Sequence, residues 1–109
     1  MRLTGAITPS ISANTNDWAP TGFDTTELIL VSSSGTYDIT GIAGGSKGKT
    51  FVLFVVTGNI TLKSESASSV AANRIVMSAE PLLEAGDGAI FTYDAVNSRW
   101  RPIITRTKA

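Results

Sequence analysis

The chain contains no cysteine and no histidine among its 109 residues. Without cysteine it forms neither a disulfide nor a thiolate metal site, and cysteine nucleophiles are excluded. Without histidine it lacks the usual general base near neutral pH, and Ser-His-Asp triads are excluded as well. Because most enzyme classes depend on one of these groups, we expect a protein that is not an enzyme and that binds no cofactor and no metal.

Excess charge and long apolar runs are also missing. Nine Lys and Arg balance nine Asp and Glu, which gives a formal net charge of zero, so whole-molecule electrostatics favours neither nucleic acid nor an anionic membrane. The longest apolar run, Phe51 to Val56, is far shorter than the roughly 20 residues of a membrane-spanning helix. The first residues show no apolar stretch typical of a signal peptide. We therefore expect a soluble chain with no nucleic-acid or membrane partner.

The residues that are present favour β-structure in one domain. Short runs rich in β-branched and aromatic residues alternate with turn signals, and no segment has a convincing helical pattern. These runs predict strands at 27–33, 36–42, 49–57, 59–63, 74–78, 88–94 and 99–105. Ser34-Gly35 predicts a tight hairpin between the first two. The pattern indicates an all-β fold, an antiparallel β-sandwich or a jelly-roll-like barrel.

The N-terminal part has a different composition. Residues 1–26 are rich in Thr, Ser, Asn and Pro, and their few apolar side chains are isolated. This composition predicts an extended arm, followed by the β-sandwich domain over residues 27–109.

The run from Phe51 to Val56 is apolar on both faces of its predicted strand. The second sheet of a sandwich covers one face, so the other requires a folded-over arm, a neighbouring subunit or further cover within the same chain. We expect a homotrimer. The candidate assembly contacts lie in the arm and on this strand: Ile7, Ile11, Trp18, Phe23, Phe51, Leu53 and Val55.

Two further segments suggest binding sites. Residues 43–50 (AGGSKGKT) fit a relaxed phosphate-binding loop, but a β-type run follows where such a loop opens a helix, so we interpret them as a β–β connection. An aromatic and basic group near the C-terminus either contacts a sugar, a phosphate or an acidic surface, or belongs to ordinary packing and solvated surface. Its members are Tyr93, Arg99, Trp100 and Arg101.

Several short motifs occur in an order that resembles a β-structured module of tailed-bacteriophage virion proteins, over roughly residues 14–103. They are residues 18–23 (WAPTGF), 39–45 (ITGIAGG), 60–62 (ITL) with Ser66 and Ser69, 73–75 (NRI), 93–95 (YDA) and 98–101 (SRWR). The resemblance implies a trimeric β-sandwich or jelly-roll domain of a tail fibre, head fibre or capsid decoration protein, with a structural or adhesive role. It also implies that Asn73 and Arg74 fix the loop after the Leu62 strand, and that 93–94 and 99–100 form a closing hairpin.

The sequence contains no coiled-coil or collagen-like shaft. This favours a small capsid decoration, or cement, protein that binds the assembled phage head as a homotrimer and stabilises it. Its partners would be two further copies and the major capsid protein. It would lie on the capsid surface, and in the host cytoplasm before assembly. The alternative is a receptor-binding or tip domain of a tail fibre that recognises host-surface glycan.

Overall fold

The computed structural model describes residues 5–105, and these residues form a β-structure with two short 3-10 turns. The strands are β1 (Ala6–Ile7), β2 (Ser10–Ile11), β3 (Leu28–Ile39), β4 (Thr50–Leu62), β5 (Leu82–Leu83), β6 (Gly88–Asp94) and β7 (Arg99–Thr105). The 3-10 turns are η1 (Phe23–Thr25) and η2 (Ala71–Asn73). The predicted all-β fold is confirmed. Within the described range no helix is long and apolar enough to span a membrane.

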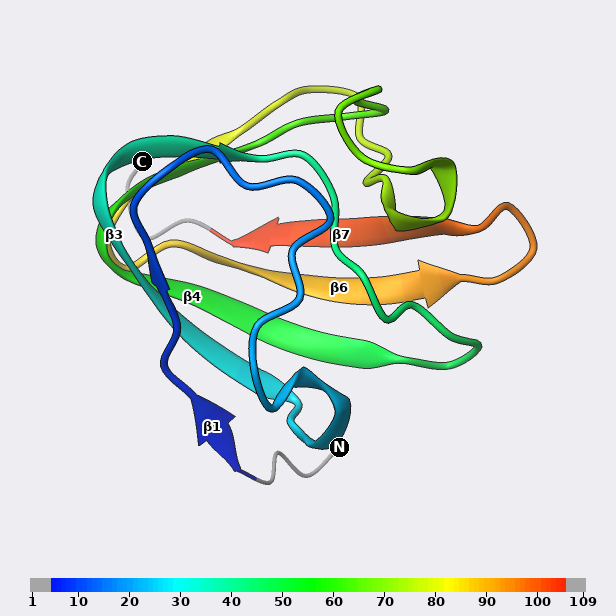
Figure 1. Ribbon diagram of the computed structural model, residues 1–109, viewed down its shortest axis with the longest axis horizontal. Helices are drawn as coiled ribbons and strands as arrows, with labels where there is room; N and C mark the ends of the chain where they lie inside the picture. Colours follow the sequence, from blue (N-terminus) through cyan, green and yellow to red (C-terminus); the bar gives the residue numbers. More distant parts are fainter. Residues whose placement is uncertain (1–4, 106–109) are drawn as a thin grey trace.

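The strands form one mixed sheet in the order β1-β3-β4-β6-β7 (Figure 1). β1 and β2 pair with β3 in parallel, and β3 pairs with β4 in parallel. The pairs β4–β5, β4–β6 and β6–β7 are antiparallel. The prediction of a purely antiparallel arrangement is therefore wrong for the N-terminal half.

The predicted hairpin at Ser34-Gly35 is also wrong, because β3 passes through these residues without reversing and pairs with β4 on both sides of them. The Ser33 hydroxyl donates to the Gly35 carbonyl (2.7 Å) and supports the irregularity there. The chain just after β3 lies close to the start of β4. Trp100 donates its indole N–H to the Ile42 carbonyl (2.7 Å), and its ring packs on Phe51 of β4, 5.3 Å between ring centroids. A short connection therefore suffices between parallel strands.

A sharp bend in β3 and β4 produces this return, and Figure 1 shows both strands curving at one end of the molecule. The predicted strands at 49–57 and 59–63 are one strand that passes through Gly58. Gly58 has a φ of +75°, and a Cβ there would lie 2.1 Å from the Ser33 carbonyl oxygen. Only glycine fits where the two strands approach this closely.

The bend brings the second halves of β3 and β4 over the first halves and encloses one core. The fully buried large side chains come from both halves of these strands and from the segments around them: Ile29, Val31, Ile39, Ile42, Phe51, Leu53, Ile60, Leu62, Ile75, Leu83, Phe91 and Trp100. The predicted strand at 74–78 is not formed as such, although Ile75 bridges Ser64 and Trp100.

The predicted N-terminal arm is part of this domain wherever the structure describes it. Ile11, Trp18 and Phe23 are buried, with relative exposures of 4%, 6% and 5%. After β2, the N-terminal segment continues its parallel pairing along β3 and the residues that follow it: Thr15 lies opposite Ile39, and Trp18 lies opposite Ile42. The prediction of an extended arm, with a domain boundary after residue 26, is thus wrong for residues 5–26. A few isolated apolar side chains are enough to fix a polar segment on a core. Residues 1–4 lie outside the described part.

Candidate functional site

The outer face of the sheet, which points away from the core, carries an apolar row across four strands. Leu28 of β3 lies opposite Val52 of β4, Val52 opposite Ile90 of β6, and Ile90 opposite Ile103 of β7. Residues paired in this way point to the same side of a sheet. We call this row, together with Leu30, Phe54 and Val56 on the same face, the outer apolar face.

Part of the outer apolar face is exposed to solvent. Relative exposures are 39% for Phe54, 49% for Val56 and 66% for Ile103. Gly88 lies opposite Phe54, and a Cβ at Gly88 would come 2.6 Å from the Phe54 ring. The ring therefore rests over the glycine and widens the apolar surface across β4 and β6. Exposed apolar surface that spans several strands commonly marks protein–protein contacts.

The seven residues of the outer apolar face include no charged side chain. The charged residues on this side of β6 and β7 are Asp94, Arg99 and Arg101. Arg101 pairs with Asp94 at 2.8 Å, and Arg99 pairs with Glu65 at 2.6 Å. Hydrogen bonds from the side chains of Asn97 and Arg101 lower the pKa of Asp94 below its ordinary value. An apolar surface beside a neutralised pair suits another apolar protein surface better than a charged ligand.

The structure places the predicted assembly contacts elsewhere. Phe51, Leu53 and Val55 are 0–1% exposed and, like Ile11, Trp18 and Phe23, belong to the core, while Ile7 is half-buried against it. These side chains are not available to another subunit, so their assignment as contacts is wrong. The sequence showed that both faces of the strand are apolar, and the structure shows that the opposite face is exposed in part, at Phe54 and Val56.

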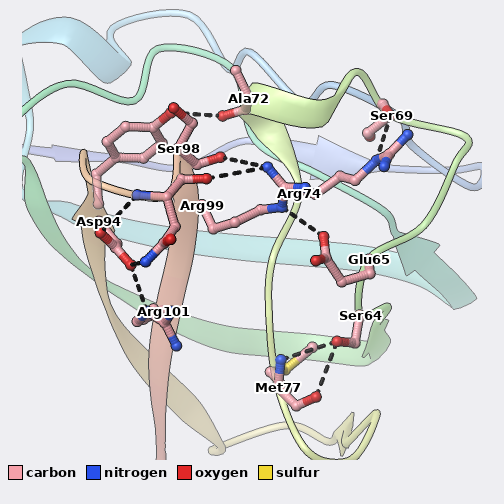
Figure 2. A network of polar contacts seen from close by, with 12 residues as sticks. Ser64, Glu65, Ser69, Ala72, Arg74, Met77, Asp94, Ser98, Arg99 and Arg101 are labelled. Atoms are coloured by element: carbon pink, nitrogen blue, oxygen red, sulfur yellow. Dashed lines mark hydrogen bonds and ion pairs between the residues drawn. The ribbon is translucent and has the colours of Figure 1, made fainter.

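The predicted aromatic and basic surface is not exposed as a unit. Trp100 has no exposed surface, and half-buried Tyr93 packs on it and donates its hydroxyl to the Ala72 carbonyl (2.9 Å). Arg99 pairs with Glu65 at 2.6 Å, as Arg101 does with Asp94 (Figure 2). The prediction of an exposed Trp100 is wrong, and both arginines are neutralised, so the group offers neither a stacking platform nor a free basic patch.

Three of the residues that carried the resemblance, Thr40, Ser69 and Asn73, meet in a hydrogen-bond network around Asp17. Asp17 accepts hydrogen bonds from the Asn73 side chain and the Val70 N–H, both at 2.9 Å. Its own N–H donates to the Ser69 hydroxyl (2.9 Å), which is 2.7 Å from the hydroxyl of Thr40. The bonds from Asn73 and Val70 lower the pKa of Asp17. This network ties the N-terminal segment to the loop after β4.

Two roles implied by the resemblance hold in the structure. Asn73 fixes the loop after Leu62 through Asp17, and Arg74 fixes it by donating to the Ser69 carbonyl (3.0 Å, Figure 2). The segments at 93–94 and 99–100 pair as the closing hairpin. These positions support the fold.

The glycine-rich loop also has a structural role. Lys49 donates to the carbonyls of Phe23 (3.0 Å) and Thr26 (3.2 Å) and lies 4.5 Å from the centroid of the Phe23 ring. Residues 43–50 connect two strands, as predicted, and Thr50 begins β4 rather than a helix. The lysine that would contact phosphate is engaged with the protein's own backbone.

Sequence reasoning missed Phe54, Val56 and Ile103 as surface residues. For Ile103 the sequence did contain a signal, since its side chain lies on the opposite face of the strand from Trp100 and on the same face as Arg99 and Arg101.

In the described part of the chain, no group of three or more acidic side chains is placed to hold a metal ion. No protein-family model, curated protein or solved structure matches this chain.

Proposed function

We propose that this chain is a structural protein of a tailed-bacteriophage virion, a capsid decoration protein that binds the assembled head as a homotrimer. The resemblance of its motifs to a module of tailed-bacteriophage virion proteins supports the assignment to a virion. The observation that carries a structural, protein-binding role is the outer apolar face, an uncharged surface across β3, β4, β6 and β7 that the described chain leaves partly in water.

Association through this face has a clear energetic basis. Fully burying a side chain such as Phe54 or Ile103 stabilises by about 1.5–3 kcal/mol relative to leaving it exposed. Three copies around a common axis would each bury the exposed residues of this face. A formal net charge of zero means that the copies carry no net repulsion.

Stabilisation of a phage head would then follow from binding alone. A protein that binds the assembled shell, and not its dissociated subunits, shifts the equilibrium toward the shell by mass action. A trimer contacts several capsomers at once, so each contact raises the effective concentration of the next. No catalytic group is needed.

The copy number of the chain in purified virions tests this role. Quantitative mass spectrometry would compare the chain with the major capsid protein of the same particles. Decoration predicts a ratio of the same order as the capsid protein. A ratio of a few per cent or less contradicts decoration and favours the tail-fibre alternative, in which binding to host-surface glycan is the next measurement.

A further inference from the structure

The edge of β7 is only partly paired along its length. Trp100 donates its backbone N–H to the Arg74 carbonyl and accepts the Val76 N–H at its own carbonyl, both at 3.0 Å. Backbone groups two residues apart in a strand point to the same side. The backbone groups of Pro102 and Ile104 therefore point to this same edge, where no residue between 5 and 105 continues the pairing beyond Trp100.

Proline explains why the pairing stops. If the segment from Arg74 to Val76 continued along β7, the next bond would need an N–H from residue 102, and Pro102 has none. The chain instead leaves the edge after Val76 and returns to the sheet at β5. The Pro102 carbonyl and both backbone groups of Ile104 remain directed at the gap.

The gap is a cleft of about 550 Å³ with mainly apolar walls. Met77, Pro81 and Leu82 line one side, and Pro102 and Ile104 line the other. Glu80 stands at the rim, but its carboxylate accepts the Ser64 N–H (2.8 Å) and pairs with Lys63 (2.9 Å). The cleft therefore offers apolar surface, backbone groups that no residue between 5 and 105 pairs, and a carboxylate that is already neutralised.

We propose that this cleft binds an extended, uncharged segment of another protein, which adds to the β7 edge at Ile104 and places an aliphatic side chain between Leu82 and Pro102. Backbone groups of an added strand supply the acceptor and donor that the edge lacks, and an apolar side chain fills the cleft. A charged segment is disfavoured because Glu80 and Lys63 already satisfy each other. The inference is independent of the proposed function and of the outer apolar face.

Amide exchange of the full-length protein, followed by NMR, tests the site. The probe is the blocked peptide acetyl-Thr-Val-Thr-Val-Thr-amide, and the control is the same peptide with every backbone nitrogen methylated. We expect the probe to slow exchange of the Ile104 amide by about tenfold at ten times its Kd, and to shift the signals of Met77 and Leu82. The control should do neither.

Two variants locate the effect. Leu82→Asp, which places a charge at the cleft, should abolish the response, whereas Val70→Asp, at a residue 59% exposed outside the cleft, should retain it. Both spectra must show a folded chain, and Leu82→Ala replaces the first variant if it is unfolded. Unchanged Ile104 exchange with the probe, an equal response to the methylated peptide or a full response in the folded Leu82 variant would overturn the proposal.

Discussion

The two faces of the sheet formed by β3, β4, β6 and β7 have similar side chains and different surroundings. On the inner face Ile29, Leu53 and Ala89 are paired across the strands and are 0–1% exposed. One residue along, the outer face pairs Leu28, Val52 and Ile90 in the same way and continues to Ile103, which is 66% exposed. The chain covers one apolar face with its own segments and leaves the other partly in water.

The difference arises from the bend and not from composition. β4 turns back at Gly58 together with β3, and the N-terminal segment pairs along the returning part, so these segments cover the inner face. In β4 the residues of both faces are apolar from Phe51 to Val56. The composition of such a strand therefore does not indicate which of its two faces the chain itself covers.

Truncating one aromatic residue on each face gives the largest contrast. Phe91→Ala on the inner face should lower the free energy of unfolding by about 3–5 kcal/mol, because it removes a buried ring and leaves a cavity. Phe54→Ala on the outer face should lower it by about 1 kcal/mol, since the ring is already partly in water. Urea unfolding followed by tryptophan fluorescence, at concentrations where the chain is monomeric, measures both. Equal losses would contradict the assignment of the two faces.

Substitution at the bend should have the next largest effect, because the bend covers the inner face. Gly58→Ala forces alanine to a positive φ, which costs about 1–3 kcal/mol, and also places its Cβ 2.1 Å from the Ser33 carbonyl oxygen. Gly48→Ala is the matched control, since Gly48 has a φ of +82° but nothing within 4 Å of its Cβ. The same unfolding measurement should show a clearly larger loss at Gly58. Similar losses at the two sites would mean that the close approach is not required.

Acid should weaken the attachment of the N-terminal segment, with a smaller effect. Hydrogen bonds from Asn73 and Val70 lower the pKa of Asp17 in the folded chain, so its contribution is present above its ordinary pKa and is lost as pH falls through the lowered value. Below about pH 4 the wild type should therefore lose stability relative to Asp17→Asn, which has no carboxylate to protonate. Thermal unfolding from pH 6 to pH 2 measures this, with the exposed Asp24→Asn as a control. Parallel curves for the wild type and Asp17→Asn would exclude the role.

Part of this structure could be predicted from the sequence. Local propensity and turn chemistry located β6, β7 and the turn between them, as well as the central apolar strand. The parallel winding could not be predicted, because Ser34-Gly35 has the composition of a hairpin turn and its role as a bulge depends on the approach of Gly58 from β4. The burial of Ile11 and Trp18 also depends on distant residues, since it follows from pairing with β3 and the segment after it.

For the candidate site, the sequence identified the right strand and the wrong face. Phe51, Leu53 and Val55 were as plausible as Val52, Phe54 and Val56, because alternation distinguishes the faces only when one of them is polar. Trp100 was a candidate for the exposed surface because its indole has a polar N–H group and it flanks a turn. Its alternation with Arg99 and Arg101 along the strand instead places Trp100 in the core and Ile103 on the surface.

The oligomeric state of single-residue variants tests most directly whether copies meet at the outer apolar face. Light scattering at micromolar concentration should give the wild type the mass of three chains of 11.4 kDa. Val96→Asp, at a residue 92% exposed on the hairpin tip, should remain trimeric. Ile103→Asp should give folded monomers, because it places a charge within the apolar row. A monomeric wild type, or an Ile103→Asp variant that remains trimeric, would contradict the account.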